Sequence, residues 1–163
     1  MSRDYKKTIR RFEKGFDKKT TRKLKDLVGF FKDKKEVERI LKSGNPVLYE
    51  VFIKEFPPID LGLTVINSGT IGKEYYFTKG HIHGKKTPEF YILLDGKGEL
   101  LLRKRSGKRK IVHLKKGKIA LIEKGYAHRI VNIGRKKLKV LTIYHEKSKP
   151  DYSVIFKKKF FKR

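Results

Sequence analysis

The stretch that decides the fold of this chain is Gly80-His81-Ile82-His83-Gly84-Lys85-Lys86-Thr87-Pro88-Glu89. In an extended segment, side chains two positions apart project from the same face, so His81 and His83 form a pair of imidazoles. Glu89 can join them from the next strand, and His128 stands in a second short motif farther along the chain. Three ring nitrogens and one carboxylate oxygen suit a divalent metal ion. The pattern predicts a metal site formed by these four side chains.

After Pro46 the chain is a series of short hydrophobic segments that recur about every ten residues, with glycine-bearing turns between them. Asp95-Gly96-Lys97-Gly98 is typical of a hairpin turn. Segments at this spacing predict an all-β sandwich or barrel. Strands are expected at residues 47–53, 63–66, 74–78, 90–94, 99–105, 110–114, 118–122, 129–133 and 138–144, and near 152–156.

The first 45 residues have a different character. Residues 1–28 are basic, with scattered hydrophobic residues, and we interpret them as an arm that packs on the domain or on a partner subunit. Asp33 and Glu36 form a capping-box pattern, hydrophobic residues follow at helical spacing, and Gly44 ends the run. This predicts one short helix at about residues 33–43. We therefore expect a single domain, with the basic arm and helix in residues 1–45 and a barrel in residues 46–163.

The composition excludes several classes of protein and site. The 163 residues include no Cys, which rules out disulfides and thiolate metal ligands. No apolar run approaches the roughly 20 residues that a membrane span requires, so we expect no membrane association. The N-terminal residues lack the apolar core of a secretory signal. A cytoplasmic location is the resulting expectation.

The net charge of +27, from 44 Lys and Arg against 17 Asp and Glu, has two interpretations. Phosphate neutralisation by basic side chains would make the protein a nucleic-acid binder. A lysine-rich, solvated surface gives the same charge without such a partner. The basic residues are spread over the whole chain and no nucleic-acid recognition motif is present, so we favour the second interpretation. Weak, non-specific binding of RNA or DNA is expected in either case.

The two histidine motifs resemble the two cupin motifs. The first is the His-x-His pair followed by Glu89 and, after six residues, Gly96; the second is Gly125-Tyr126-Ala127-His128-Arg129-Ile130-Val131-Asn132. Residues 22–31, 46–51, 72–74, 78–83 and 126–134 are further similar to the archaeal cupin-type glucose-6-phosphate isomerases, and the similarity covers about residues 19–161. The resemblance implies a cupin, which is a jelly-roll-like double-stranded β-helix barrel.

The resemblance also implies a site. It implies one divalent metal ion per subunit, iron(II) first, with manganese, nickel or zinc as alternatives, and it implies a homodimer. The ligands would be His81, His83, Glu89 and His128. The catalytic residues would be Glu89, Tyr91 and His128. The positions that match substrate-binding residues are Tyr49, which with Tyr91 lines the sugar site, and Thr64, Thr78, Gly80 and Tyr144 around the phosphate.

The implied reaction is the interconversion of glucose 6-phosphate and fructose 6-phosphate in glycolysis and gluconeogenesis. A hydrogen must move between C1 and C2 of the open-chain sugar. A metal ion can stabilise the developing enediolate, and a carboxylate beside it can shuttle the proton. Glu89 is the candidate for both ligand and base. A hydride shift is the rival mechanism, and the sequence does not separate the two.

Two departures from the family pattern keep other functions open. Five residues separate His83 from Glu89, where six are expected, and one residue reverses strand parity unless the loop absorbs it. Pro150 stands where the family commonly has a histidine near the phosphate. The alternatives are a related metal cupin that acts on another sugar phosphate, and a non-enzymatic cupin module that binds small anions or RNA.

Overall fold

Antiparallel strands make up most of the computed structural model, which describes residues 14–83 and 87–152. The larger sheet has six strands in the order β1-β2-β3-β12-β7-β10, and a second has three in the order β11-β8-β9. The six are β1 (Lys18–Lys23), β2 (Val47–Phe56), β3 (Ile59–Ile66), β12 (Leu138–His145), β7 (Glu89–Asp95) and β10 (Ile119–Ile122). The three are β11 (Tyr126–Asn132), β8 (Gly98–Lys104) and β9 (Arg109–His113). Two-stranded pairs join β13 (Pro150–Asp151) to β6 (Ile82–His83) and β4 (Thr70–Ile71) to β5 (Glu74–Tyr75).

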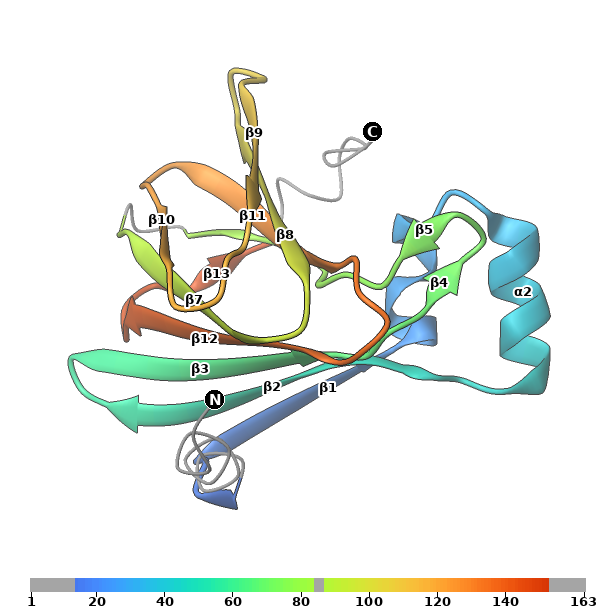
Figure 1. Ribbon diagram of the computed structural model, residues 1–163, viewed down its shortest axis with the longest axis horizontal. Helices are drawn as coiled ribbons and strands as arrows, with labels where there is room; N and C mark the ends of the chain where they lie inside the picture. The colour runs from blue at the N-terminus through green and yellow to red at the C-terminus, as the bar shows by residue number, and fades with distance from the viewer. Residues whose placement is uncertain (1–13, 84–86, 153–163) are drawn as a thin grey trace.

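The two main sheets curve around one interior (Figure 1). Strands distant in sequence are neighbours, since β12 lies between β3 and β7, and β8 pairs with β11 rather than with β7. Turns such as the one between β7 and β8 carry the chain from one sheet to the other. Gly96 makes that turn possible because its φ is +88° and a Cβ there would lie 2.7 Å from the Lys137 carbonyl oxygen. The all-β barrel predicted from the sequence is confirmed.

The helical segments cover one end of the barrel (Figure 1). The predicted helix is α2 (Lys34–Ser43), and its N-cap Asp33 accepts a hydrogen bond from the Glu36 amide at 2.9 Å. Before it lies a 3-10 helix, η1 (Leu24–Phe30), which buries Leu24 and Leu27 completely. In the described part of the chain, no helix is long and apolar enough to cross a membrane.

The strand predictions differ from the structure in several places, and β3 and β11 begin earlier than expected, at Ile59 and Tyr126. β1 was not expected, because its sequence Lys-Lys-Thr-Thr-Arg-Lys is polar throughout; it pairs with β2 from Lys18 to Lys23. The strand expected at 74–78 is wrong beyond Tyr75, since β5 ends there and Phe77 makes only an isolated bridge to Val131. Of the stretch expected near 152–156, residues 153–156 lie outside the described residues. The division at residue 45/46 stays a prediction, although β1 extends the barrel sheet into the expected arm.

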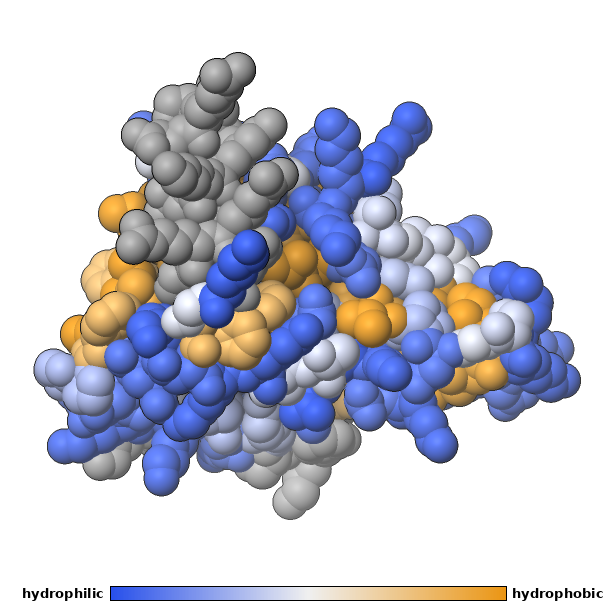
Figure 2. All heavy atoms as spheres, turned by 90° about the horizontal axis from the view of Figure 1, so that it is seen from below, coloured by the Kyte–Doolittle hydropathy of each residue, from blue (hydrophilic) through white to orange (hydrophobic). Residues whose placement is uncertain are grey.

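The large sheet carries apolar clusters on both of its faces. Its inner face joins the main core, where Phe31 stacks on Phe77 with 4.6 Å between ring centroids. Its outer face holds a second cluster formed by Phe52, Leu63, Val65 and Leu94. Figure 2 views the molecule from below and shows hydrophobic residues among the basic ones, notably toward the end where β7 and β10 lie.

Candidate metal centre

His81, one of the predicted ligands, is held in place by backbone pairing with the His128 segment. The His81 amide donates to the His128 carbonyl at 3.2 Å, and the His128 amide donates back to the His81 carbonyl at 2.9 Å. Gly80 has φ +78°, in the left-handed region that glycine adopts at little cost, and so turns the chain into this pairing. Ligands 47 positions apart in sequence are thereby directly opposite each other.

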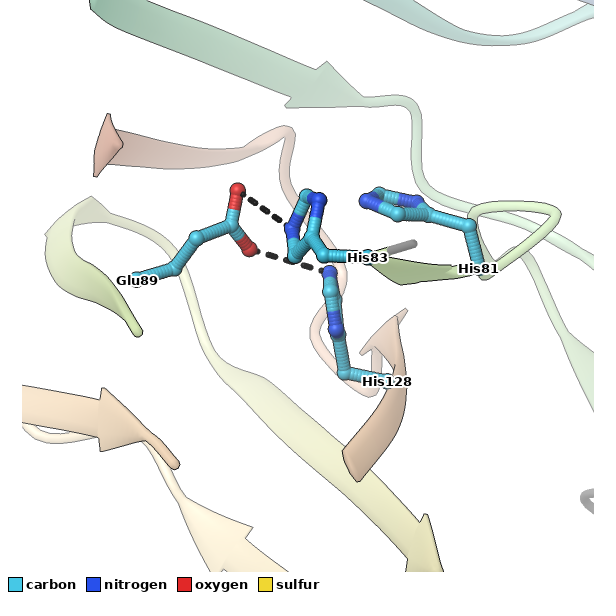
Figure 3. Close-up of side chains that lie close together, drawn as sticks. All are labelled: His81, His83, Glu89 and His128. Atoms are coloured by element: carbon cyan, nitrogen blue, oxygen red, sulfur yellow. Dashed lines mark ion pairs between the residues drawn. The ribbon is translucent and has the colours of Figure 1, made fainter. Parts of the chain in front are cut away.

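The four predicted ligands converge on one point (Figure 3). Their ligand atoms all lie within 4.8 Å of one another. Nε2 of His83 is 3.0 Å from Oε1 of Glu89, and Nε2 of His128 is 3.1 Å from Oε2 of the same carboxylate. The shorter loop before Glu89 therefore does not displace its side chain from the histidines. Glu89 and His128 are buried, with 4% and 2% of their surface exposed.

The protonation of His83 shows that the cluster fits a cation. Nδ1 of His83 lies 2.9 Å from the Ser148 carbonyl oxygen, which can only accept, so Nδ1 carries the hydrogen. Nε2 of the neutral ring then presents a lone pair to a carboxylate oxygen of Glu89 only 3.0 Å away. Two acceptors at that distance repel each other unless a proton or a metal ion lies between them. The buried His128 Nε2 and Glu89 Oε2 also have no hydrogen-bond partner. An N₃O ligand set of this kind fits a divalent transition metal.

The electrostatics of Glu89 and His81 favour the ligand forms of these two groups near neutral pH. Burial raises the pKa of Glu89, but the His128 and His83 rings outweigh it and hold that pKa below its ordinary value. Burial, together with the charge of His128, lowers the pKa of His81 well below its ordinary value. For His83 burial lowers the pKa, but hydrogen bonding to Glu89 outweighs this and the pKa is raised. A proton on His83 is therefore the main competitor of a bound ion.

A cavity of about 270 Å³ opens beside the four ligands. Its lining includes every site residue predicted from the sequence. Besides the ligands, these are Tyr49, Thr64, Thr78, Gly80, Tyr91 and Tyr144. The structure thus brings the predicted residues together, while their roles stay predictions.

Three tyrosines give the cavity neutral hydroxyl groups. Burial raises the pKa of Tyr91 well above its ordinary value, and the adjacent Glu89 adds to the effect. Burial likewise raises the pKa of Tyr49 and, together with Asp60, that of Tyr144. The Tyr49 hydroxyl accepts a hydrogen bond from the Lys79 amide at 3.2 Å. These groups remain phenols at neutral pH and are suited to hydrogen-bond a sugar.

Sequence reasoning missed several residues that line the cavity. Thr20 and Arg22 reach it from β1, the strand that was not predicted. Their spacing of two was the available signal, because it places both side chains on one face of a strand. Pro150 and Tyr152 line another part of the cavity, and the Tyr152 ring centroid lies 5.9 Å from that of His81.

A second cavity, of about 470 Å³, lies apart from the four ligands. Lys32, Tyr75, Leu101 and Val131 are among its lining residues, and none of the metal ligands is. The smaller cavity is the candidate active site because the converging donor atoms are there. Arg129 belongs to the wall of the larger one, and it donates a hydrogen bond to the Lys79 carbonyl at 2.8 Å.

Comparison with known proteins identifies the family. The family model described as glucose-6-phosphate isomerase matches residues 21–161. The chain belongs to the glucose-6-phosphate isomerase family. It is 35% identical to glucose-6-phosphate isomerase of Pyrococcus abyssi and 36% identical to that of Pyrococcus furiosus, in each case over 89% of this chain and 79% of the relative. A putative glucose-6-phosphate isomerase 2 of Rhizobium meliloti is 30% identical over 88% and 75%. The predicted family and isomerase class are confirmed.

Solved structures show the fold. Oxalate decarboxylase of Bacillus subtilis matches with a TM-score of 0.53 and 19% identity, over 61% of this chain and 26% of that one. Oxalate decarboxylase of Lactobacillus farciminis matches with a TM-score of 0.52 and 21% identity, over 65% and 30%. This chain thus spans between a quarter and a third of those proteins. At such identity the likeness establishes a shared cupin barrel, as predicted, and nothing about activity.

Proposed function

We propose that this chain is a metal-dependent isomerase that interconverts glucose 6-phosphate and fructose 6-phosphate in glycolysis and gluconeogenesis. The observation that carries the proposal is the convergence of three histidines and Glu89 at the wall of a cavity lined by hydroxyl and basic groups. Family membership agrees with it. Metal ligands beside hydroxyl groups are what an open-chain sugar with vicinal oxygens requires.

One divalent ion per subunit would be held by His81, His83, Glu89 and His128. Iron(II) is the first candidate, and manganese, nickel and zinc suit the same nitrogen and oxygen donors. Such an ion supplies Lewis-acid stabilisation of negative charge on the C1 and C2 oxygens. The Ser148 carbonyl fixes the His83 ring in the tautomer that ligation needs. Thr87 and Ser148 join their hydroxyls in a hydrogen bond behind this ring.

Glu89 would move the proton between C1 and C2. Its lowered pKa keeps it ionised, which is the form that a general base needs. Tyr91 lies beside it with a phenol that stays protonated, so it can donate a hydrogen bond to a substrate oxygen or to the carboxylate. Tyr49, Thr64, Thr78, Gly80 and Tyr144 would orient the sugar and its phosphate. This assigns Glu89, Tyr91 and His128 to catalysis, with His128 acting as a ligand.

A coupled assay of fructose 6-phosphate conversion tests the proposal directly. Metal-stripped protein should be inactive, and iron(II), manganese, nickel or zinc added singly should restore turnover to differing extents. Other phosphorylated aldoses and ketoses belong in the same assay because Pro150 offers no charge or N–H to the cavity. Metal-bound protein that turns over another sugar phosphate but not fructose 6-phosphate would shift the function to a related isomerase. No turnover of any sugar would contradict the proposal.

The proposal extends to a homodimer. β10 is an edge strand of the large sheet, and its Ile119 and Leu121 are 66% and 48% exposed. Phe90, opposite Leu121 on β7, is 41% exposed. Adjacent exposed apolar groups at a sheet edge are a common interaction surface. Sedimentation of the wild type and of Leu121→Glu should show a dimer that the substitution weakens.

Weak nucleic-acid binding has one supporting observation. The β8–β9 hairpin projects from the barrel (Figure 1), and residues 100–122, which include most of it, contain nine Lys or Arg and no Asp or Glu. A basic ribbon attracts phosphate without base recognition, so any binding should fall steeply with salt. A cytoplasmic location stays a prediction.

A further inference from the structure

Strand β1 brings a cation into the active-site cavity. Arg22 is paired in register with Tyr49 of β2, and both side chains line the cavity. Thr20, two residues earlier on β1, lies on the same face. The cavity wall therefore continues past the barrel strands onto the edge strand of the large sheet. Glu89, on β7, is separated from β1 by β2, β3 and β12 in that sheet.

A second cation, Lys79, lines the cavity from the segment that precedes β6. Lys79 precedes Gly80 and the His81 ligand, and its Nζ lies 4.5 Å from the ring centroid of Tyr152. Its amide donates to the Tyr49 hydroxyl, so Tyr49 connects the segment of Lys79 to the strand that pairs with β1. The Arg22 charge is close enough to act on both Lys79 and the Tyr49 phenol.

The charge of this cavity is distributed unevenly. Among the described residues that line it, Glu89 is the sole carboxylate, and Glu89 belongs to the metal ligands. Asp26, whose charge also reaches Lys79, is outside the lining. Two like charges that face one space repel each other, and an anion between them removes that cost. Arg22 also carries the planar fork of donors that matches phosphate oxygens.

We propose that Arg22 and Lys79 form a cationic clamp that binds the phosphate group of the substrate, at the part of the cavity remote from Glu89. The clamp supplies the positive charge, while the hydroxyl and backbone groups of Thr64, Thr78 and Gly80 supply neutral hydrogen bonds. This inference rests on the proposed function only for the identity of the sugar, because the clamp itself recognises the phosphate monoester group.

The test uses the metal-loaded full chain with Arg22→Gln, Lys79→Gln and Lys19→Gln. Lys19 is the matched control: it lies on β1 but pairs with Glu50, contacts Phe52 and does not line the cavity. Each clamp substitution should raise KM for fructose 6-phosphate about 10- to 100-fold, the range for losing one charged hydrogen-bond partner, with kcat within about threefold. Arg22→Lys should recover part of the loss, and Lys19→Gln should behave as wild type.

Calorimetry separates the clamp from the proposed function. Inorganic phosphate and glucose 6-phosphate are titrated into each variant, with glucose as the probe that lacks a phosphate. Weakened binding of both phosphates, with glucose unaffected, supports the clamp even where no isomerase turnover is found. Phosphate binding equal to wild type in Arg22→Gln and Lys79→Gln, or a fall in kcat without a change in KM, would overturn the clamp while leaving the isomerase assignment intact. Thermal unfolding within a few degrees of wild type shows that each variant is folded.

Discussion

Asn132 gives a prediction whose size follows from its hydrogen bonds. Its side-chain nitrogen lies 3.1 Å from the carbonyl oxygens of Ile66 and Asn67 and 2.9 Å from that of Lys136. Its side-chain oxygen accepts from the Gly134 amide at 3.0 Å. The side chain is fully buried. One amide therefore ties the end of β11 to the end of β3 and to the turn before β12.

We expect Asn132→Ala to destabilise the fold without removing a ligand. An amide nitrogen has two hydrogens, so three carbonyls share two donors and the side chain is worth about three hydrogen bonds. At about 1 kcal/mol net for each bond, with more for buried groups left unpaired, the free energy of unfolding should fall by about 3–4 kcal/mol. Against a typical domain stability of 5–15 kcal/mol this is a large fraction, and at about 2–4 °C per kcal/mol the melting temperature should fall by roughly 10 °C.

Urea unfolding of the metal-free protein, followed by circular dichroism, measures this loss without stabilisation by a bound ion. Asn132→Asp is the matched variant, because it keeps the size and the accepting oxygen but turns a second oxygen toward three carbonyls. It should be at least as destabilising as alanine. A loss under about 1 kcal/mol for alanine, or an aspartate variant as stable as wild type, would refute the reasoning. Metal stoichiometry at low temperature should remain that of the wild type.

Three further predictions concern the metal centre and the cavity. His128→Ala should abolish metal-dependent turnover and weaken metal binding at least tenfold in a calorimetric titration; activity with normal affinity would remove it from the ligand set. Below the raised pKa of His83, metal binding should release a proton from this ring, whereas His81, whose pKa is lowered, should release none. Metal affinity should then fall as pH drops through the raised pKa of His83. The His83–Glu89 pair stabilises the metal-free protein below pH about 6.5, and this stabilisation is lost as pH rises through the raised pKa. Titrations in two buffers of different ionisation enthalpy give the number of protons released, and a count of zero or three would contradict the assignment. Gly62→Ala should destabilise the protein by about 1–3 kcal/mol, because a Cβ there meets the Thr142 hydroxyl that donates to the Gly62 carbonyl. Urea unfolding measures this loss of stability. Gly29→Ala is the control, because a Cβ at that position meets nothing within 4 Å.

The convergence of the four candidate ligands was predictable in part, because some of it follows from local rules. The spacing of two in His81 and His83 fixes a shared face, and Gly80 marks the turn that precedes them. The pairing of His81 with His128 is not a local property, and only the motif resemblance suggested that the two meet. The loop before Glu89 shows the limit of local rules. Its shorter length predicted that the Glu89 side chain could point to the other face of the strand, but that side chain nevertheless reaches His83.

The sequence analysis did not predict β1, which forms part of the cavity wall, for a physical reason. A strand is recognised by alternating hydrophobic residues, and β1 has none between Lys18 and Lys23 because its inward groups meet a polar cavity. Arg22 therefore read as one more surface cation in a chain of 44 Lys and Arg. The helix η1 was also not predicted, because Leu24 and Leu27 alone are too few to establish a helical period.

The separation of the cavity walls has an evolutionary consequence. The four predicted metal ligands come from β6, the residue before it, β7 and β11, whereas Arg22 comes from the edge strand β1, which precedes these elements in sequence. Substitutions in β1 can thus alter which anion is accepted while the reactive centre is inherited unchanged. A duplicated copy of this chain could diverge toward a new substrate through its first 25 residues, and a library randomised at positions 20 and 22 would reproduce that path in the laboratory.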